Sequence, residues 1–290
     1  MGQVRVVSDT THYLPREVVE RLGIEQVSLY VNWQGRTDRE IDLPDFDAYY
    51  AHLRTAEDLP TTSQPSVGDF LEVYEPILRA GEDIISLHLS GSISGTVQSA
   101  TQARDHLVEQ GADAARIEIV DARTACGGLG AMVLCAAHLA ERGATAAEIV
   151  EAVGKLREDL LIWFAVDTLE FLRRGGRIGA ARAYVGTALR VKPILTLEEE
   201  ITPVERVRTA GRAFERMVEF MRERFDDGCD RFIVQHVQDA ERAERLVAAG
   251  REIFGNDPVW VSEIGPVIGT HVGPGLLGVC GVQSRLLYPG

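Results

Sequence analysis

The alternation of short apolar runs with amphipathic segments constrains this chain more than any other feature of its sequence. Apolar runs such as residues 84–89 and 160–166 are separated by stretches that carry apolar side chains at helical spacing. Strands that alternate with helices form parallel or mixed sheets with helices on their faces. The sequence therefore predicts an α/β fold, and ligands of such folds gather at the carboxyl ends of the strands.

The chain is long enough for two domains, and the alternation suggests where they divide. Its 290 residues fit one large or two ordinary domains, and we expect two, at residues 1–159 and 160–290. In the second domain we expect a helix over residues 180–190. We also expect a hairpin of residues 192–197 and 201–207, with its first strand at a sheet edge because Pro193 lies near the start of that strand.

Composition excludes several classes of function. With 30 basic and 44 acidic residues, the net charge of −14 repels phosphate backbones, so we expect no nucleic-acid partner. No apolar run reaches the roughly 18 residues of a membrane span, and the first residues show no signal-peptide pattern. The four cysteines form no CxxC pair and the histidines no HExxH motif. We therefore expect a reduced, cytoplasmic protein without a metal site.

Residues 84–103 carry the clearest candidate for an anion site. A buried strand enters a loop of glycine and hydroxyl residues and continues as a helix. Ser94 suits the N-cap of that helix, and Gly95 lets a ligand approach the backbone closely. Free N–H groups at a helix start bind anions. A capped turn without a ligand would explain the same residues.

Thr62 lies in a second polar loop, LPTTSQPS at residues 59–66, ahead of a helix. Ser66 and Asp69 have the spacing of a capping box that starts this helix. Turn formation alone would also account for such residues. A third loop, residues 126–130, suggests dinucleotide binding, but Val133 stands where the last glycine of G-x-G-x-x-G is needed, so close packing explains its glycines better.

Residues 264–279 contain five glycines, branched apolar residues and one histidine, His271. This stretch is too rich in glycine for a plain helix or strand, so we expect backbone wrapped around a ligand. A structural role for His271 remains an alternative. The expected apolar walls are Val267, Ile268, Val272, Leu276 and Leu277.

Six motifs together resemble one known family. They are VSDTT at 7–11, LPTTSQPS at 59–66, SGTVQSA at 94–100, LEFLRRGGRI at 169–178, KPIL at 192–195 and IGPVIGTHVGPG at 264–275. With these motifs the chain resembles the DegV family of bacterial fatty-acid-binding proteins over nearly its full length.

The resemblance implies two α/β domains that hold a long-chain fatty acid, such as palmitate, between them for transport. It implies that Thr62, Ser94, the N–H of Gly95 and His271 bind the carboxylate. Relatives present the acid to an ATP-dependent fatty acid kinase, and Arg173 is the implied contact for the phosphate or the kinase. The implied role is non-catalytic, with no cofactor besides the bound acid.

This chain departs from the family pattern at several positions. Gly91 and Val97 stand where the family usually has serine and tyrosine, Ala122 and Cys126 replace serines, and acidic residues 198–200 replace a turn. These changes leave the head-group residues intact. Because of these changes, the resemblance does not predict the acyl-chain preference or the details of the partner contacts.

An enzymatic alternative would make Ser94 a nucleophile and His271 its base in an acyl hydrolase or transferase. The N–H groups at the helix start would then serve as an oxyanion hole, with Asp9 or Asp121 orienting the histidine. However, residues 91–95, GSISG, miss the G-x-S-x-G nucleophile motif because Ile93 stands where the serine is needed. The sequence favours binding over catalysis.

Overall fold

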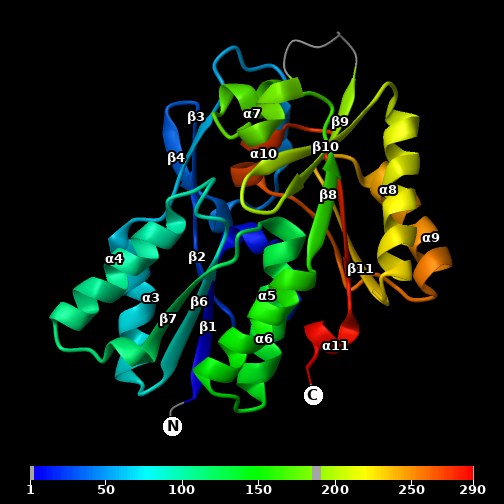
Figure 1. Cartoon of the computed structure of the whole chain (residues 1–290). Coiled ribbons are helices and arrows are strands. Elements are labelled where there is room, and N and C mark those ends of the chain that lie inside the picture. Colours follow the sequence, from blue (N-terminus) through cyan, green and yellow to red (C-terminus); the bar gives the residue numbers. More distant parts are fainter. Residues whose placement is uncertain (1–2, 185–190, 290) are drawn as a thin grey trace.

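The computed structural model describes residues 3–184 and 191–289 and shows a two-domain α/β fold with three sheets (Figure 1). A parallel four-stranded sheet and a mixed six-stranded sheet stand on either side of α5 (Cys126–Glu141). A small antiparallel sheet lies at one end of the molecule. The predicted fold class, with parallel and mixed sheets flanked by helices, is confirmed.

The four-stranded sheet is buried on both faces. Its parallel strands, in the order β2-β1-β6-β7, are β1 (Val4–Asp9), β2 (Glu25–Val27), β6 (Asp83–His88) and β7 (Ile117–Asp121). Neighbouring residues of one strand enter different cores: Ile84 packs with α3 and α4, and Ile85 with α5. The helices of this part are α1 (Arg16–Leu22), α3 (Val67–Arg79), α4 (Thr96–Glu109), α5 and α6 (Ala146–Asp159).

The six-stranded sheet has one face under two helices and the other face toward α5. In the order β10-β9-β8-β13-β11-β12 its strands are β8 (Leu161–Ala165), β9 (Lys192–Leu197), β10 (Ile201–Val207), β11 (Arg231–His236), β12 (Val261–Glu263) and β13 (Leu277–Val282). The helices α8 (Ala210–Asp226) and α9 (Ala240–Phe254) cover the outer face (Figure 1). Trp163 stacks on Phe220 of α8 beneath that cover, with ring centroids 4.2 Å apart.

The small sheet closes the end of the molecule near α7 and α10, whereas α11 lies at the opposite end (Figure 1). The sheet, in the order β4-β3-β5, contains β3 (Tyr30–Trp33), β4 (Arg36–Arg39) and β5 (Thr61–Ser63). The short α-helices are α2 (Asp47–Leu53), α7 (Glu170–Arg174), α10 (Pro266–Val272) and α11 (Ser284–Leu287). The 3-10 helices are η1 (Thr10–His12), η2 (Glu40–Asp42), η3 (Ala114–Arg116) and η4 (Gly179–Tyr184).

The glycine-rich tail is more regular than its composition predicted. Residues 266–272 form α10 and residues 277–282 form β13. Pro266 suits the first turn of the helix, and Gly265 and Gly273 lie outside it. Gly269 is the one glycine within α10, and a Cβ there would overlap the ring of Tyr50. The glycine therefore permits close packing of α10 on α2, and the expectation of irregular backbone was wrong for these residues.

Two predictions about the second sheet also change. The hairpin of β9 and β10 is confirmed, but β10 is the edge strand and β9 lies inside the sheet. The paired part of β8 ends at Ala165, opposite Ile194, so Pro193 lies just beyond it and its missing N–H interrupts little of the ladder. Of the helix expected at 180–190, residues 179–184 form a 3-10 helix, and residues 185–190 lie outside the described part of the chain.

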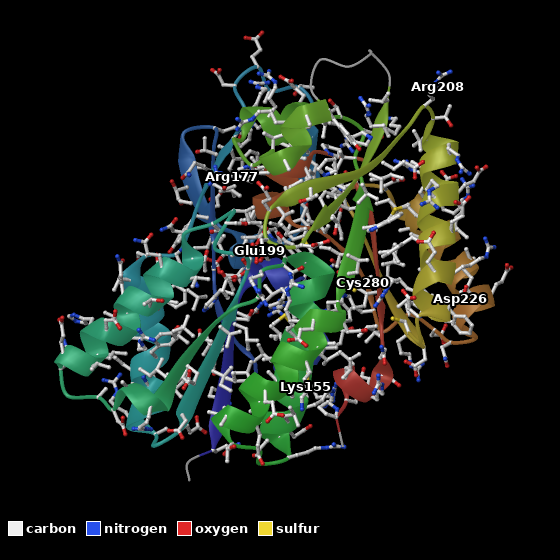
Figure 2. All side chains as sticks on the ribbon, viewed as in Figure 1. Lys155, Arg177, Glu199, Arg208, Asp226 and Cys280 are labelled. Atoms are coloured by element: carbon white, nitrogen blue, oxygen red, sulfur yellow. The ribbon has the colours of Figure 1, made fainter. Side chains whose placement is uncertain are left out.

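The two large sheets share one core and are joined by polar contacts. Arg157, at the end of α6, donates hydrogen bonds to the carbonyl oxygens of Ala122 (2.7 Å) and Glu198 (2.6 Å). Glu199 is labelled near the centre of Figure 2, and its carbonyl oxygen accepts a hydrogen bond from Ser90 Oγ at 3.1 Å. The chain leaves the four-stranded sheet before α6 and enters the six-stranded sheet at β8. The exact division between the domains at residues 159 and 160 stays a prediction. No described helix is long and apolar enough to span a membrane.

Candidate functional site

A cavity of about 290 Å³ lies between the inner face of the six-stranded sheet, the start of α5, and α10. Its volume is near the lower end of the range of small-molecule sites, about 300–1,000 Å³. Most of its wall is apolar, with Ile162 and Phe164 from β8, Ile233 from β11, and Cys280 from β13. These residues alternate with those that face α8 and α9, so the pleat of the sheet supplies the wall.

Four of the five predicted wall residues line this cavity. Three of them, Val267, Ile268 and Val272, belong to α10. The fourth, Leu276, immediately precedes β13. Leu277 is the next residue along the strand and faces the opposite side, where it packs into the core under α8 and α9. The expectation for Leu277 is therefore corrected, and contact of the other four with an acyl chain stays a prediction.

Polar side chains from distant parts of the sequence gather at one end of the cavity. Thr62 of β5, Ser94, Arg177 and His271 of α10 all line it. Thr62 Oγ1 and His271 Nε2 are 2.8 Å apart and form a hydrogen bond across 209 positions of sequence. The fold thus brings together three of the four residues proposed for the carboxylate.

The start of α4 differs in detail from the prediction. Its N-cap is Gly95, and Ser94 stands one residue earlier, where its Oγ lies 2.8 Å from Thr96 Oγ1. A Cβ on Gly95 would overlap the amide of Gln64, so this glycine lets the 59–66 loop lie against the helix start. Gly95 does not itself line the cavity, and its N–H as a carboxylate contact stays a prediction.

His271 is half-buried, and its imidazole is neutral. Burial and the nearby positive charge of Arg177 lower the pKa of His271 to about 4. Its Nε2 is bonded to Thr62, while its Nδ1 is buried against Gly175 without a hydrogen-bond partner among the described residues. A buried polar atom without a partner costs free energy, so the ring is poised to gain from a polar or anionic neighbour.

A buried carboxyl group that the sequence did not reveal holds the first turn of α10. Glu40 accepts hydrogen bonds from Val267 N–H (2.8 Å), Thr10 Oγ1 (2.7 Å) and Tyr13 OH (3.0 Å). Burial raises the pKa of Glu40 to about 7, although these hydrogen bonds oppose the rise. Tyr50 OH adds a bond to the carbonyl oxygen of Ile264 at 2.6 Å. No local sequence motif predicts the contact between Glu40 and Val267.

Two of the three arginines of the RRGGR turn, Arg173 and Arg177, occupy different places. Arg173 is exposed and forms an ion pair with Glu170 on the same helix at 2.6 Å, so it does not line the cavity. Arg177 lines it and donates to the carbonyl oxygens of Gly175 (2.9 Å) and Ile93 (3.3 Å); Figure 2 labels it below α7. Sequence reasoning chose Arg173 from this motif and missed Arg177 at the cavity.

The geometry does not assemble the hydrolase that the sequence left open. His271 bonds to Thr62 rather than to Ser94, whose hydroxyl bonds to Thr96. Asp9 orients a different histidine, with Oδ2 3.2 Å from His88 Nδ1. Asp121 accepts the N–H of Gly91. Neither carboxylate is hydrogen-bonded to His271, and no hydrogen bond joins Ser94 to His271.

A chain of Ser86, His88 and Asp9 resembles a catalytic triad but is closed to substrate. Ser86 Oγ lies 2.7 Å from His88 Nε2 and accepts from Tyr74 OH, also at 2.7 Å. All three members are fully buried and none lines the cavity. This network satisfies polar groups inside the first sheet.

The described residues offer no other obvious chemistry. No group of three or more histidine, cysteine or acidic side chains in residues 3–184 and 191–289 could hold a metal ion. All four cysteines are free, and burial raises the pKa of each thiol above its ordinary value. The expectation of a reduced, cytoplasmic compartment stays a prediction.

Comparison with known proteins gives matches along nearly the whole chain. The family model described as "Uncharacterised protein, DegV family" matches residues 3–284. A DegV domain-containing protein of Streptomyces coelicolor is 41% identical over 286 residues, covering 97% of this chain and 99% of the relative.

Two solved structures have the same fold. DegV from Bacillus subtilis, described as a fatty acid binding protein, is 34% identical with a TM-score of 0.86, over 98% of this chain and 100% of that one. A DegV family protein from Thermus thermophilus, described by its fatty acid binding, is 36% identical with a TM-score of 0.86, over 97% and 99%. The chain belongs to the DegV family.

Proposed function

We propose that this protein binds a long-chain fatty acid, with the carboxylate at the polar end of the cavity and the acyl chain along the apolar wall. The observation that carries the proposal is the cavity itself, which has polar side chains at one end and mostly apolar ones elsewhere. A fatty acid has the same division. The fatty acid binding described for two relatives of similar fold supports the assignment.

The carboxylate would be bound by Thr62, Ser94, the N–H of Gly95 and His271, with the positive charge of Arg177 nearby. Hydrogen bonds to a charged group contribute roughly 1.5–3 kcal/mol each. Each buried methylene contributes about 0.8 kcal/mol, so a long chain supplies more affinity than its head group. Part of that gain is lost in ordering the flexible chain.

We further propose that the bound acid is presented to an ATP-dependent fatty acid kinase. The exposed guanidinium of Arg173 supports a contact with the phosphate or the kinase, because arginine suits phosphate in charge and in geometry. The binding role requires no catalytic residue and no cofactor besides the acid. The protein would thus act as a carrier subunit.

Native mass spectrometry of the purified protein, followed by lipid extraction, tests the binding proposal. We expect one long-chain acid per chain, carried through purification. Competition assays with acids of increasing length should then show affinity that rises steeply until the cavity is full, with acetate scarcely binding. Affinity independent of length would mean that the ligand is a small anion and not a fatty acid.

A further inference from the structure

One polar side chain stands among the apolar walls, away from the residues proposed for the carboxylate. Gln235 of β11 lines the cavity and is only 4% exposed. Its Nε2 donates to Ser262 Oγ on the neighbouring strand at 2.9 Å. Its Oε1 accepts no hydrogen bond from any described residue, so an acceptor lies unpaired at the cavity wall.

The start of α5 brings unpaired donors to the same place. Ala125 is its N-cap and supplies no capping side chain, while Gly128 N–H and Leu129 N–H both donate to the Ala125 carbonyl oxygen. Cys126 and Gly127 come before the first N–H groups that donate within the helix. Their own N–H groups therefore have no partner within α5.

The acceptor and the donors are close together. A Cβ on Gly127 would lie 3.2 Å from Gln235 Oε1, so the amide stands directly over the start of α5. Ala125, Cys126 and Gly127 all line the cavity beside it. Burial raises the pKa of the Cys126 thiol well above its ordinary value, so this thiol brings no negative charge.

A plain hydrocarbon chain would leave all these groups unpaired, which is costly once water is excluded. A hydroxyl group both donates and accepts, so it can pair with the amide of Gln235 and with an N–H of α5 at once. A second carboxylate fits poorly, since Gln235, Ser262 and residues 125–127 provide no positive side chain.

We propose that the cavity prefers a long-chain fatty acid with a hydroxyl group on its chain, held between the amide of Gln235 and the N–H groups of Cys126 and Gly127. This inference rests on the proposed function, because the carboxylate site fixes where along the chain the hydroxyl must lie. Only a narrow range of hydroxyl positions therefore fits.

The test compares stearic acid with monohydroxystearic acids whose hydroxyl stands at different carbons. The wild-type chain should bind one narrow range of isomers about tenfold more tightly than stearic acid, the size expected of about one net hydrogen bond in a dry site. Gln235→Met should abolish this preference while keeping stearic acid bound. Gln283→Met is the matched control, since Gln283 is also buried and hydrogen-bonded but lies outside the cavity.

Three results would count against the inference. If stearic acid binds and every hydroxyl position weakens binding equally in the wild type and in Gln235→Met, the hydroxyl site is wrong and the fatty-acid proposal stands. If no acid binds the wild type, both proposals fail. Should Gln235→Met not fold, Ser262→Ala removes the hydroxyl that fixes the amide and is expected to reduce the same preference; an unchanged preference counts against the site.

Discussion

Replacing the buried Glu40 with glutamine should make the stability of this protein less dependent on pH. The carboxyl group of Glu40 is 3% exposed and accepts hydrogen bonds from Thr10, Tyr13 and Val267. Glutamine has nearly the same shape and can accept a hydrogen bond from the Val267 N–H. It cannot ionise, so the variant isolates the effect of the charge.

The sign follows from the two pKa values of the carboxyl group. Its pKa is about 7 in the fold and 4.5 ordinarily. Between these values the folded chain binds a proton that the unfolded chain has released, so this group makes stability fall as pH rises from about 4.5 to about 7. At about 1.4 kcal/mol per pKa unit, the loss is about 3 kcal/mol.

Histidines act in the opposite direction over much of the same range. Burial lowers the pKa of His12 and of His271 to about 4, so these groups make stability rise with pH up to their ordinary pKa of 6.5. The wild-type curve alone therefore mixes both effects. The difference between the variant and the wild type cancels the histidines and leaves Glu40.

Urea unfolding at a series of pH values measures this difference. We expect the unfolding free energy of Glu40→Gln, relative to the wild type, to increase by about 3 kcal/mol from pH 4.5 to pH 8. Glu17→Gln, at an exposed position in α1, should show almost no such change. A constant difference for Glu40→Gln, or one that decreases with pH, would refute the account of the buried carboxyl group.

Four further predictions concern the proposed function. Ser94→Ala should weaken fatty-acid binding about tenfold or more without changing the melting temperature, and unchanged affinity by competition assay would remove this residue from the site. Arg173→Ala should retain the acid but lower acyl-phosphate formation by a partner kinase, whereas unchanged turnover would mean that the arginine only complements the end of α7. Leu276→Ala should weaken binding while Leu277→Ala should not, although each should lower the unfolding free energy by about 2–5 kcal/mol; equal effects on binding would contradict the register of β13. A bound carboxylate should raise the pKa of His271 from about 4. The affinity for the acid should therefore fall as pH rises through the raised value. Calorimetry in buffers of different ionisation enthalpy should detect proton uptake on binding, and His271→Asn should abolish that uptake.

Local features of the sequence predicted the fold well where local chemistry decides it. Ser66 and Asp69 form the expected capping box, because both partners lie within one turn of the helix. The strand, loop and helix over residues 83–109 also form as expected. Errors of one residue remained: Gly95 replaced Ser94 as the N-cap, and Leu277 faced away from the cavity because side chains alternate along a strand.

Contacts between distant parts of the chain could not be predicted from local patterns. The resemblance of the motifs to the family predicted that Thr62 and His271 belong to one site. Their hydrogen bond, however, depends on the packing of β5 against α10. Glu40 lies in an ordinary acidic stretch, and its partner Val267 is 227 residues away. No sequence motif marks Gln235 as a candidate binding residue, because its proposed role depends on its position at the cavity wall.

The place of β13 in the six-stranded sheet has a consequence for synthesis of the chain. β13 follows the other five strands in sequence, yet it lies between β8 and β11 at the middle of the sheet. A ribosome-bound chain that lacks it has two separate groups of strands, each with an open edge that invites aggregation. Pairing across more than 100 residues is slow. Chaperones that shield strand edges should therefore matter most before β13 has emerged from the ribosome, and ligand binding should begin only after β13 has inserted into the sheet.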